Sequence, residues 1–201
     1  MDMPFEFCAL RFFLQWERKE KSLHAQMKSR PSLADIRSSL KHFQVARNFA
    51  GLKQDNRAQC ISDLLASVDS NRHLSAKEKV VQLATAFKGE FKQLNLSAAS
   101  KLLWLKHRKP YIIYDSRAVT ALHEMGHRFE KKNYAGYCKS WRQEYRRHRE
   151  NIQNATAKLV KMRSFFPTWH ADGESMSKLF GQPWFLERVF DIYLWEMGGD
   201  G

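Results

Sequence analysis

Cysteine is scarce in this chain, and its spacing excludes two kinds of cross-linked protein. The 201 residues include only Cys8, Cys60 and Cys138, and no CxxC pair occurs. Neither a zinc ribbon nor a disulfide framework is therefore indicated. Because an odd number of widely spaced cysteines suits a reducing compartment, we expect a cytoplasmic protein.

Long apolar runs are also lacking. No stretch approaches the roughly 20 apolar residues that a membrane-spanning helix needs. The apolar run near the N-terminus carries Asp2 and Glu6 and lacks a small-residue cleavage site, so it does not match a signal peptide. We expect a soluble intracellular protein that has no membrane partner.

Acidic residues are too few to balance the basic ones. The chain has 34 Lys and Arg against 21 Asp and Glu, a formal net charge of +13. Its hydrophobic share of 43% and charged share of 27% are typical of a globular protein. A basic excess of this size is the electrostatic pattern of a nucleic-acid binder, here expected to associate with the nucleoid. A protein that binds a membrane surface or an acidic partner protein would have the same charge.

Helical signals run along almost the whole chain, and no internal repeat is present. Apolar residues at three-to-four spacing predict helices over 5–29, from Pro31 onward, and over 58–68, 75–91, 98–107, 116–125, 137–164 and 183–197. Gly51 is placed to end the second helix, Ser75 opens a capping box, and Pro183 suits a first helical turn. We expect a break at 165–167 and a loop with a short helical piece over 168–182. The sequence therefore predicts a single all-α domain over residues 1–201.

Residues 94–122 hold the most specific pattern. Ser97 is placed to cap the helix that follows, since its hydroxyl can accept a hydrogen bond from a backbone N–H of the first turn. Pro110 ends that helix and leads into 111–114, an apolar run too short to assign to helix or strand. Asp115 comes next and is placed to cap a helix that begins at Ser116. A carboxylate is thereby predicted at a helix N-terminus, where the helix dipole favours negative charge.

This order of elements resembles the core of the helix-hairpin-helix DNA glycosylase superfamily, which includes the 8-oxoguanine and 3-methyladenine glycosylases. Residues 98–103 resemble the start of the helix after the hairpin, Pro110 resembles the turn proline, and Asp115 matches the catalytic aspartate. The resemblance is specific over 94–122 and implies an all-α, multi-helix, glycosylase-like domain. Its hairpin–helix–aspartate core would span 94–127.

The hairpin departs from the family pattern. Family members use glycines there to bring backbone N–H groups to a DNA phosphate, whereas residues 93–97, which include Asn95, contain none. The helix-hairpin-helix is therefore degenerate. Bifunctional members carry a lysine nucleophile at a position that aligns with Ser97 or Ala98, and the lack of a lysine there resembles a monofunctional enzyme. Lys101, one turn later, is the candidate substitute.

The resemblance gives Asp115 a chemical role. As the catalytic carboxylate it would stabilise the oxocarbenium-like sugar while the N-glycosidic bond breaks, and would orient or activate water, in parallel with the carboxylates of glycoside hydrolysis. The competing interpretation is that Asp115 only caps a helix, which contributes about 1 kcal/mol.

Basic and aromatic residues around this stretch supply candidate DNA contacts. The candidates for phosphate contact near the turn are Asn95, Lys106, Arg108, Lys109, Ser116 and Arg117. Arg142, Arg146 and Arg149 recur on one face of the helix predicted over 137–164. The rings that could stack on an extruded base are Trp104, Tyr111 and Tyr114. The alternatives are a solvated basic face and core aromatics.

One motif competes with this interpretation. His123, Glu124 and His127 match HExxH, in which two histidines bind zinc and the glutamate is a general base. The charged Arg128 that follows, and Gly126 as a helix end, argue against a zinc-protease helix. We expect no metal and no other cofactor.

The sequence thus favours a monofunctional DNA glycosylase, acting as a monomer on a modified or damaged base in double-stranded DNA, including modified bases of foreign (phage) genomes. The second hypothesis is a non-catalytic DNA- or RNA-binding module on the same scaffold. The third is a zinc hydrolase that uses the HExxH residues.

Overall fold

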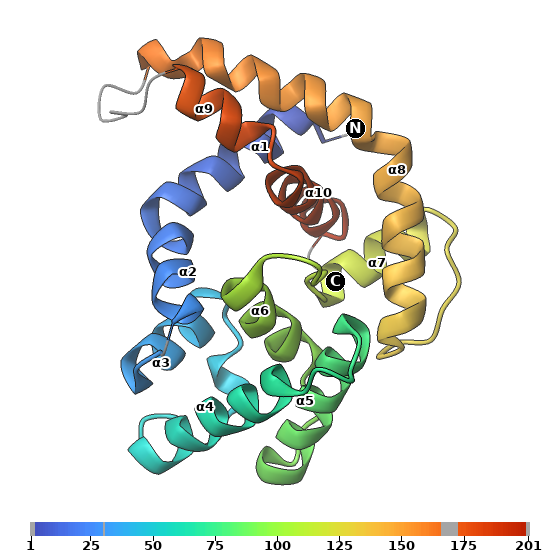
Figure 1. Cartoon of the computed structure of the whole chain (residues 1–201). Coiled ribbons are helices and arrows are strands. Elements are labelled where there is room, and N and C mark those ends of the chain that lie inside the picture. Colours follow the sequence, from blue (N-terminus) through green and yellow to red (C-terminus); the bar gives the residue numbers. More distant parts are fainter. Residues whose placement is uncertain (1–2, 30, 166–172, 200–201) are drawn as a thin grey trace. The chain divides into compact units, whose positions relative to one another are not determined.

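In the computed structural model, which describes residues 3–29, 31–165 and 173–199, the chain is all-α (Figure 1). The first half contains α1 (Phe5–Gln15), a π-helical turn (Trp16–Glu20), α2 (Lys21–Lys28), α3 (Leu33–His42), a 3-10 turn (Ala46–Asn48), α4 (Asp55–Ser70) and α5 (Ala76–Phe91). The second half contains α6 (Leu96–His107), α7 (Ser116–Glu124), α8 (Tyr134–Leu159), a 3-10 segment (Val160–Phe165), α9 (Gly173–Phe180) and α10 (Pro183–Met197). Over these three ranges no strand forms, and no helix is long and apolar enough to cross a membrane. The predicted all-α class is confirmed.

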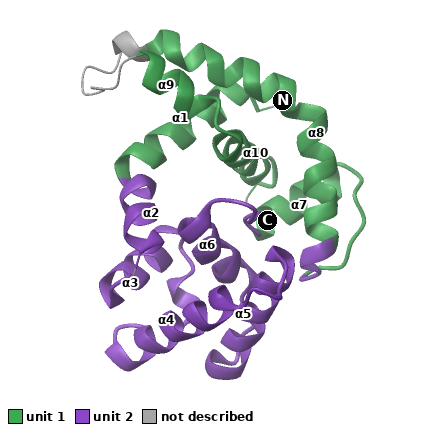
Figure 2. Ribbon diagram, viewed as in Figure 1, with its two compact units in different colours: residues 1–18, 115–131, 136–201 green, residues 19–114, 132–135 purple. Residues whose placement is uncertain are grey.

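The chain divides into two compact units (Figure 2). Unit 1 comprises residues 1–18, 115–131 and 136–201, and unit 2 comprises residues 19–114 and 132–135. Each unit combines segments that are distant in the sequence. The expectation of a single domain over 1–201 stays a prediction.

Unit 2 is built around α6. This helix packs against α2, α3, α4 and α5. It is apolar on nearly every side, and it is buried from Leu96 to Leu105 except at the partly exposed Ser97. A helix that is apolar all round is expected at the centre of a core rather than at its surface.

The α6 helix and the start of α8 also fix the extended run at 111–114. Ser100 Oγ accepts a hydrogen bond from the Tyr114 N–H at 2.9 Å, and the Tyr134 hydroxyl donates to the Ile112 carbonyl at 2.7 Å. The run belongs to neither a helix nor a strand. Side chains therefore supply hydrogen-bond partners for the Tyr114 N–H and the Ile112 carbonyl, where a neighbouring strand would supply them in a sheet.

Unit 1 is built around α10, which packs against α1, α7 and α9. Pro183 occupies its first turn, as predicted, and nearly every residue from Trp184 to Leu194 is buried. Rings from α8 complete this core: the centroids of Trp141 and Phe190 lie 5.1 Å apart with nearly perpendicular planes. Edge-to-face pairs of this kind add to the free energy of apolar burial.

Several predicted helix ends differ from the structure. The cap of α6 is Asn95, whose Oδ1 accepts from the Ala98 N–H at 3.0 Å, so the assignment of Ser97 as cap is wrong. Helix α3 ends at His42 rather than near Gly51, because the chain turns at Gln44 with φ +56°. Gly51 instead lies in a later turn with φ +74°.

Other predicted ends are confirmed. Ser75 and Glu78 form the reciprocal capping box of α5, which ends at Phe91. Gly126, with φ +90°, follows the end of α7. Residues 166–172 of the predicted break at 165–167 and loop at 168–182 lie outside the described residues. The short helical piece expected in that loop is α9 (Gly173–Phe180).

Candidate active site

Asp115 caps α7, as the sequence predicts. It has extended backbone angles, φ −140° and ψ +143°, and its Oδ1 accepts the Arg117 N–H at 3.1 Å. The residue is partly exposed. The side chain is therefore held by a backbone amide at the positive end of a helix dipole, which favours a negative charge there.

The last turns of α10 support this end of α7. The Arg117 guanidinium lies 4.0 Å from the centroid of the Trp195 ring, and Arg11 from α1 lies 4.8 Å from the same centroid. Arg11 also forms an ion pair with Glu196. A Cβ atom at Gly198 would overlap the backbone of Arg117, so only glycine fits this close approach. The predicted DNA-contact residue Arg117 thus packs on an aromatic ring.

A second carboxyl group belongs to the same unit. Asp191 on α10 is buried, and its Oδ1 accepts the Trp141 Nε1–H at 2.9 Å, while Arg188 Nη1 lies 4.0 Å from Oδ2. Burial raises the pKa of Asp191 to about 7, and the negative charges of Glu187 and Asp115 act in the same direction. Arg188 and the Trp141 hydrogen bond oppose the rise in pKa.

Sequence reasoning missed Asp191. Its one local signal is an acidic residue inside the apolar run Val189-Phe190-Asp191-Ile192. A carboxyl group in such a run is either buried with a partner or marks a functional site.

The other two predicted catalytic residues lie in unit 2. Lys101 Nζ donates to Ser97 Oγ at 2.9 Å across one turn of α6. Lys101 is 7% exposed, and its Nζ lies 5.7 Å from the centroid of the Phe43 ring. The structure thus brings Ser97 and Lys101 together as a pair, and the catalytic assignment of both stays a prediction.

The three predicted base-pocket rings are buried in this structure. Trp104, Tyr111 and Tyr114 are 2%, 6% and 9% exposed. The Tyr114 hydroxyl accepts the Lys132 N–H at 3.1 Å, and burial raises the pKa of Tyr111 to about 12. These rings pack in unit 2 as core residues do, and a base could stack on them only after they became exposed. Their role in base binding stays a prediction.

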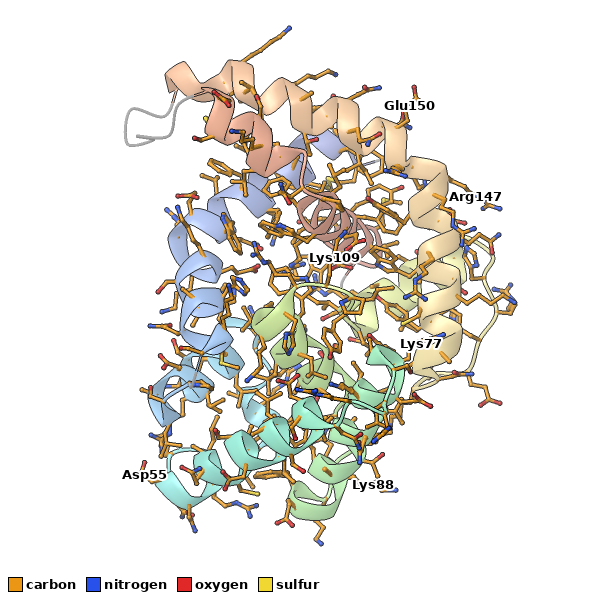
Figure 3. The ribbon with its side chains drawn as sticks, in the orientation of Figure 1. Asp55, Lys77, Lys88, Lys109, Arg147 and Glu150 are labelled. Carbon is orange, nitrogen blue, oxygen red and sulfur yellow. The ribbon has the colours of Figure 1, made fainter. Side chains whose placement is uncertain are left out.

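The predicted phosphate contacts at the turn differ in accessibility. Asn95 is buried as the α6 cap, and Lys106 Nζ lies 3.5 Å from an oxygen of Asp69. Arg108, with φ +62°, is partly exposed, and burial lowers the pKa of its guanidinium. Lys109 and Ser116 are exposed. Lys109, labelled in Figure 3, is therefore one of the exposed candidates at this turn, whereas Asn95 is buried.

Helix α8 carries the other predicted DNA contacts. Arg146 and Arg149 are exposed, and Arg142 is partly exposed. The three positions follow i, i+4 and i+7 spacing and therefore share one side of the helix. Arg147 and Glu150, also exposed, can be located on α8 in Figure 3. The exposure of these arginines is compatible with phosphate contact.

The HExxH residues do not form a zinc-protease helix. Helix α7 ends at Glu124, so His127 does not follow His123 by one helical turn. His127 Nε2 lies 2.7 Å from Glu144 Oε1, and His123 Nε2 lies 3.1 Å from the carbonyl oxygen of Phe129. Among the residues that the structure describes, no group of three His, Cys, Asp or Glu side chains is placed to hold a metal ion. The zinc-hydrolase hypothesis is therefore not supported by the geometry of its own motif.

Comparison with known proteins adds no assignment. No protein-family model, curated protein or solved structure matches this chain.

Proposed function

We propose that this protein is a monofunctional DNA glycosylase that hydrolyses the N-glycosidic bond of a modified or damaged base, with Asp115 as its catalytic carboxylate. The observation that carries the proposal is the position of Asp115. Its partly exposed carboxylate is held by the Arg117 N–H at the start of α7. The sequence order of hairpin, helix, proline turn and aspartate supports the same assignment, and so do the net charge of +13 and the exposed arginines of α8.

The chemistry needs an anion at a fixed place. When the bond between C1′ and the base nitrogen breaks, the electron pair leaves with the base and the sugar becomes positively charged. A carboxylate held in advance by a backbone amide stabilises that charge without having to reorganise. Water then adds at C1′, and its proton passes to a carboxylate or to the departing base. The products are an abasic site and the free base.

A second candidate is a non-catalytic module that binds DNA or RNA. It is favoured by the burial of Trp104, Tyr111 and Tyr114, which leaves no aromatic platform of these three residues exposed for a base. In that case the carboxylate of Asp115 is only a helix cap. The exposed arginines would bind phosphates by charge alone.

The decisive variant is Asp115→Asn. Asparagine caps a helix about as well as aspartate, so this change removes the charge and leaves the cap. Glu150→Gln is the matched control, because it removes one negative charge from an exposed position on α8.

The assay measures abasic sites by alkali-induced strand cleavage, with and without a chelator. The substrates are duplexes that carry damaged or modified bases and genomic DNA from phages with modified bases. We expect chelator-resistant abasic sites with the native protein and Glu150→Gln, and a loss of at least about a hundredfold with Asp115→Asn. Salt-sensitive binding without base release on any substrate would establish the binding module instead.

A further inference from the structure

The Trp195 ring on α10 contacts two cationic side chains from other helices. The guanidinium carbon of Arg117 lies over the ring at 4.0 Å from its centroid, and that of Arg11 lies at 4.8 Å. Trp195 and Arg117 are both partly exposed, so this contact lies at the surface of unit 1. The ion pair with Glu196 offsets the charge of Arg11. Arg117 is therefore the cation of this group that is best suited to a further anion.

Arg117 is fixed at its backbone as well as at its side chain. The end of α10 approaches α7 so closely that a Cβ atom at Gly198 would overlap the Arg117 backbone. The Arg117 N–H donates to Asp115 Oδ1 at 3.1 Å. A long side chain that binds an anion loses rotational freedom, and one that already rests on a ring has less freedom to lose.

Contact with a ring does not prevent an arginine from binding a phosphate. A guanidinium has five N–H donors in one plane, and two of them can pair with two oxygens of a phosphate. Attraction between a cation and the face of a ring is electrostatic and uses none of these donors. The Trp195 ring can therefore orient the Arg117 guanidinium while the group keeps its donors for a phosphate.

We propose that Trp195 is a positioning residue for DNA binding, which holds the Arg117 guanidinium for one phosphate of the nucleotide that is presented to Asp115. Arg117 then holds the phosphate through its side chain and the carboxylate through its N–H, so a single residue relates the two. The placing of the nucleotide at Asp115 rests on the proposed glycosylase function. The phosphate contact does not, because every duplex presents phosphates.

The first test measures the affinity for an undamaged duplex as a function of salt concentration. In Arg117→Gln the slope of log affinity against log salt should fall by about one, the loss of one phosphate contact. Trp195→Leu should weaken binding by about three- to tenfold, and Trp195→Phe, which keeps an aromatic face, should restore most of the loss. An unchanged slope in Arg117→Gln, or equal losses in Trp195→Leu and Trp195→Phe, would overturn the proposal.

Two double variants separate positioning from a general loss of structure. If Trp195 acts through the guanidinium, Arg117→Gln combined with Trp195→Leu should bind no more weakly than Arg117→Gln alone. Additive losses would show that Trp195 acts on the fold instead. The matched control, Arg11→Gln combined with Glu196→Gln, removes the neighbouring ion pair without a change in net charge and should leave the salt slope unchanged. A slope lowered by about one in this control would assign the contact to Arg11 and overturn the proposal.

The native protein supplies a measurement that needs no variant of Trp195. The Arg117 Nε–H signal, assigned by its loss in Arg117→Gln, should shift in a ¹H–¹⁵N spectrum when the undamaged duplex is added. A signal that does not move on binding would overturn the phosphate contact.

The second test measures single-turnover base release at saturating protein, where differences in affinity no longer matter. Trp195→Leu should lower this rate by about ten- to a hundredfold, since a misplaced nucleotide reacts slowly, and Trp195→Phe should restore most of it. A rate that is unchanged in Trp195→Leu would overturn the placing of the nucleotide at Asp115. If no substrate releases a base but the salt slope falls in Arg117→Gln and the losses at Trp195 follow the first test, the glycosylase is refuted and the positioning by Trp195 is supported.

Discussion

The replacement of Asp191 by asparagine should make the stability of the protein less dependent on pH between about pH 4 and pH 7. Asp191 is buried against Trp141, and burial raises its pKa from 3.8 to about 7. Between these two values the unfolded chain has released the proton that the folded chain still holds. Folding therefore takes up a proton, and Asp191 makes the folded state progressively less stable as the pH rises through this window. Above about pH 7 the cost is constant.

The magnitude follows from the size of the shift. About three pKa units correspond to about 4 kcal/mol of unfolding free energy at full ionisation. About 2–3 kcal/mol of this amount should develop between pH 5 and pH 8. Asp191→Asn cannot ionise, so its unfolding free energy relative to the native protein should rise by that amount over the same range.

Urea denaturation followed by circular dichroism at several pH values measures this difference. The comparison of two proteins at each pH cancels groups that titrate in both, including Glu6 and Glu78, whose pKa values are lowered by hydrogen bonds to Lys158 and Ser75. A difference that stays constant from pH 5 to pH 8 would show that Asp191 is already ionised at pH 5, and the reasoning from burial would be refuted.

Three further predictions concern other parts of the chain. Gly198→Ala should lower the unfolding free energy by about 1–3 kcal/mol, because the new Cβ meets the Arg117 backbone. Gly89→Ala inside α5 should raise it by about 0.5–1 kcal/mol, because the new Cβ meets no atom within 4 Å and alanine favours a helix more than glycine does. Urea denaturation that ranks the two variants in the opposite order would contradict the packing. Replacing Arg146 and Arg149 on α8 with glutamine should reduce the slope of log affinity against log salt by about two for duplex DNA, and an unchanged slope would remove α8 from the interface. Borohydride treatment during base release should trap no covalent DNA complex through Lys101, and a trapped complex would show a bifunctional enzyme.

The parts of the fold that the sequence predicts correctly depend on short-range physics. Ser75 and the residue three positions on satisfy each other's backbone groups, and Pro183 needs only a first helical turn. The prediction of the α6 cap was wrong because Asn95 and Ser97 are both residue types that cap helices well, so the sequence does not choose between them. In the structure α6 begins at Leu96, which is 4% exposed within unit 2, and that burial is a tertiary feature that the local sequence does not show. Similarly, no sequence rule indicates that Gln44 adopts φ +56° and ends α3 well before Gly51.

The candidate site shows the same contrast between residues that short-range signals predict and residues whose setting depends on tertiary packing. Asp115 is detectable from sequence because its cap geometry involves only the next two residues. Asp191 is not, because its burial and its hydrogen bond to Trp141 depend on the packing of α7 and α8 against α10, which the residues next to it do not encode. The same holds for Arg117, which the sequence presents as a free basic residue and the fold places on Trp195.

The cap and the catalytic role of Asp115 are compatible rather than competing. A carboxylate that stabilises a cationic sugar must stay fixed while the bond breaks, and a side chain held by the Arg117 N–H has lost much of its rotational freedom already. Capping geometry alone therefore cannot argue against catalysis. What separates the two roles is charge, since the cap needs only an acceptor oxygen and the oxocarbenium-like sugar needs an anion. Asparagine at this position supplies the first without the second, so a stable Asp115→Asn protein that still released bases would refute the carboxylate mechanism directly.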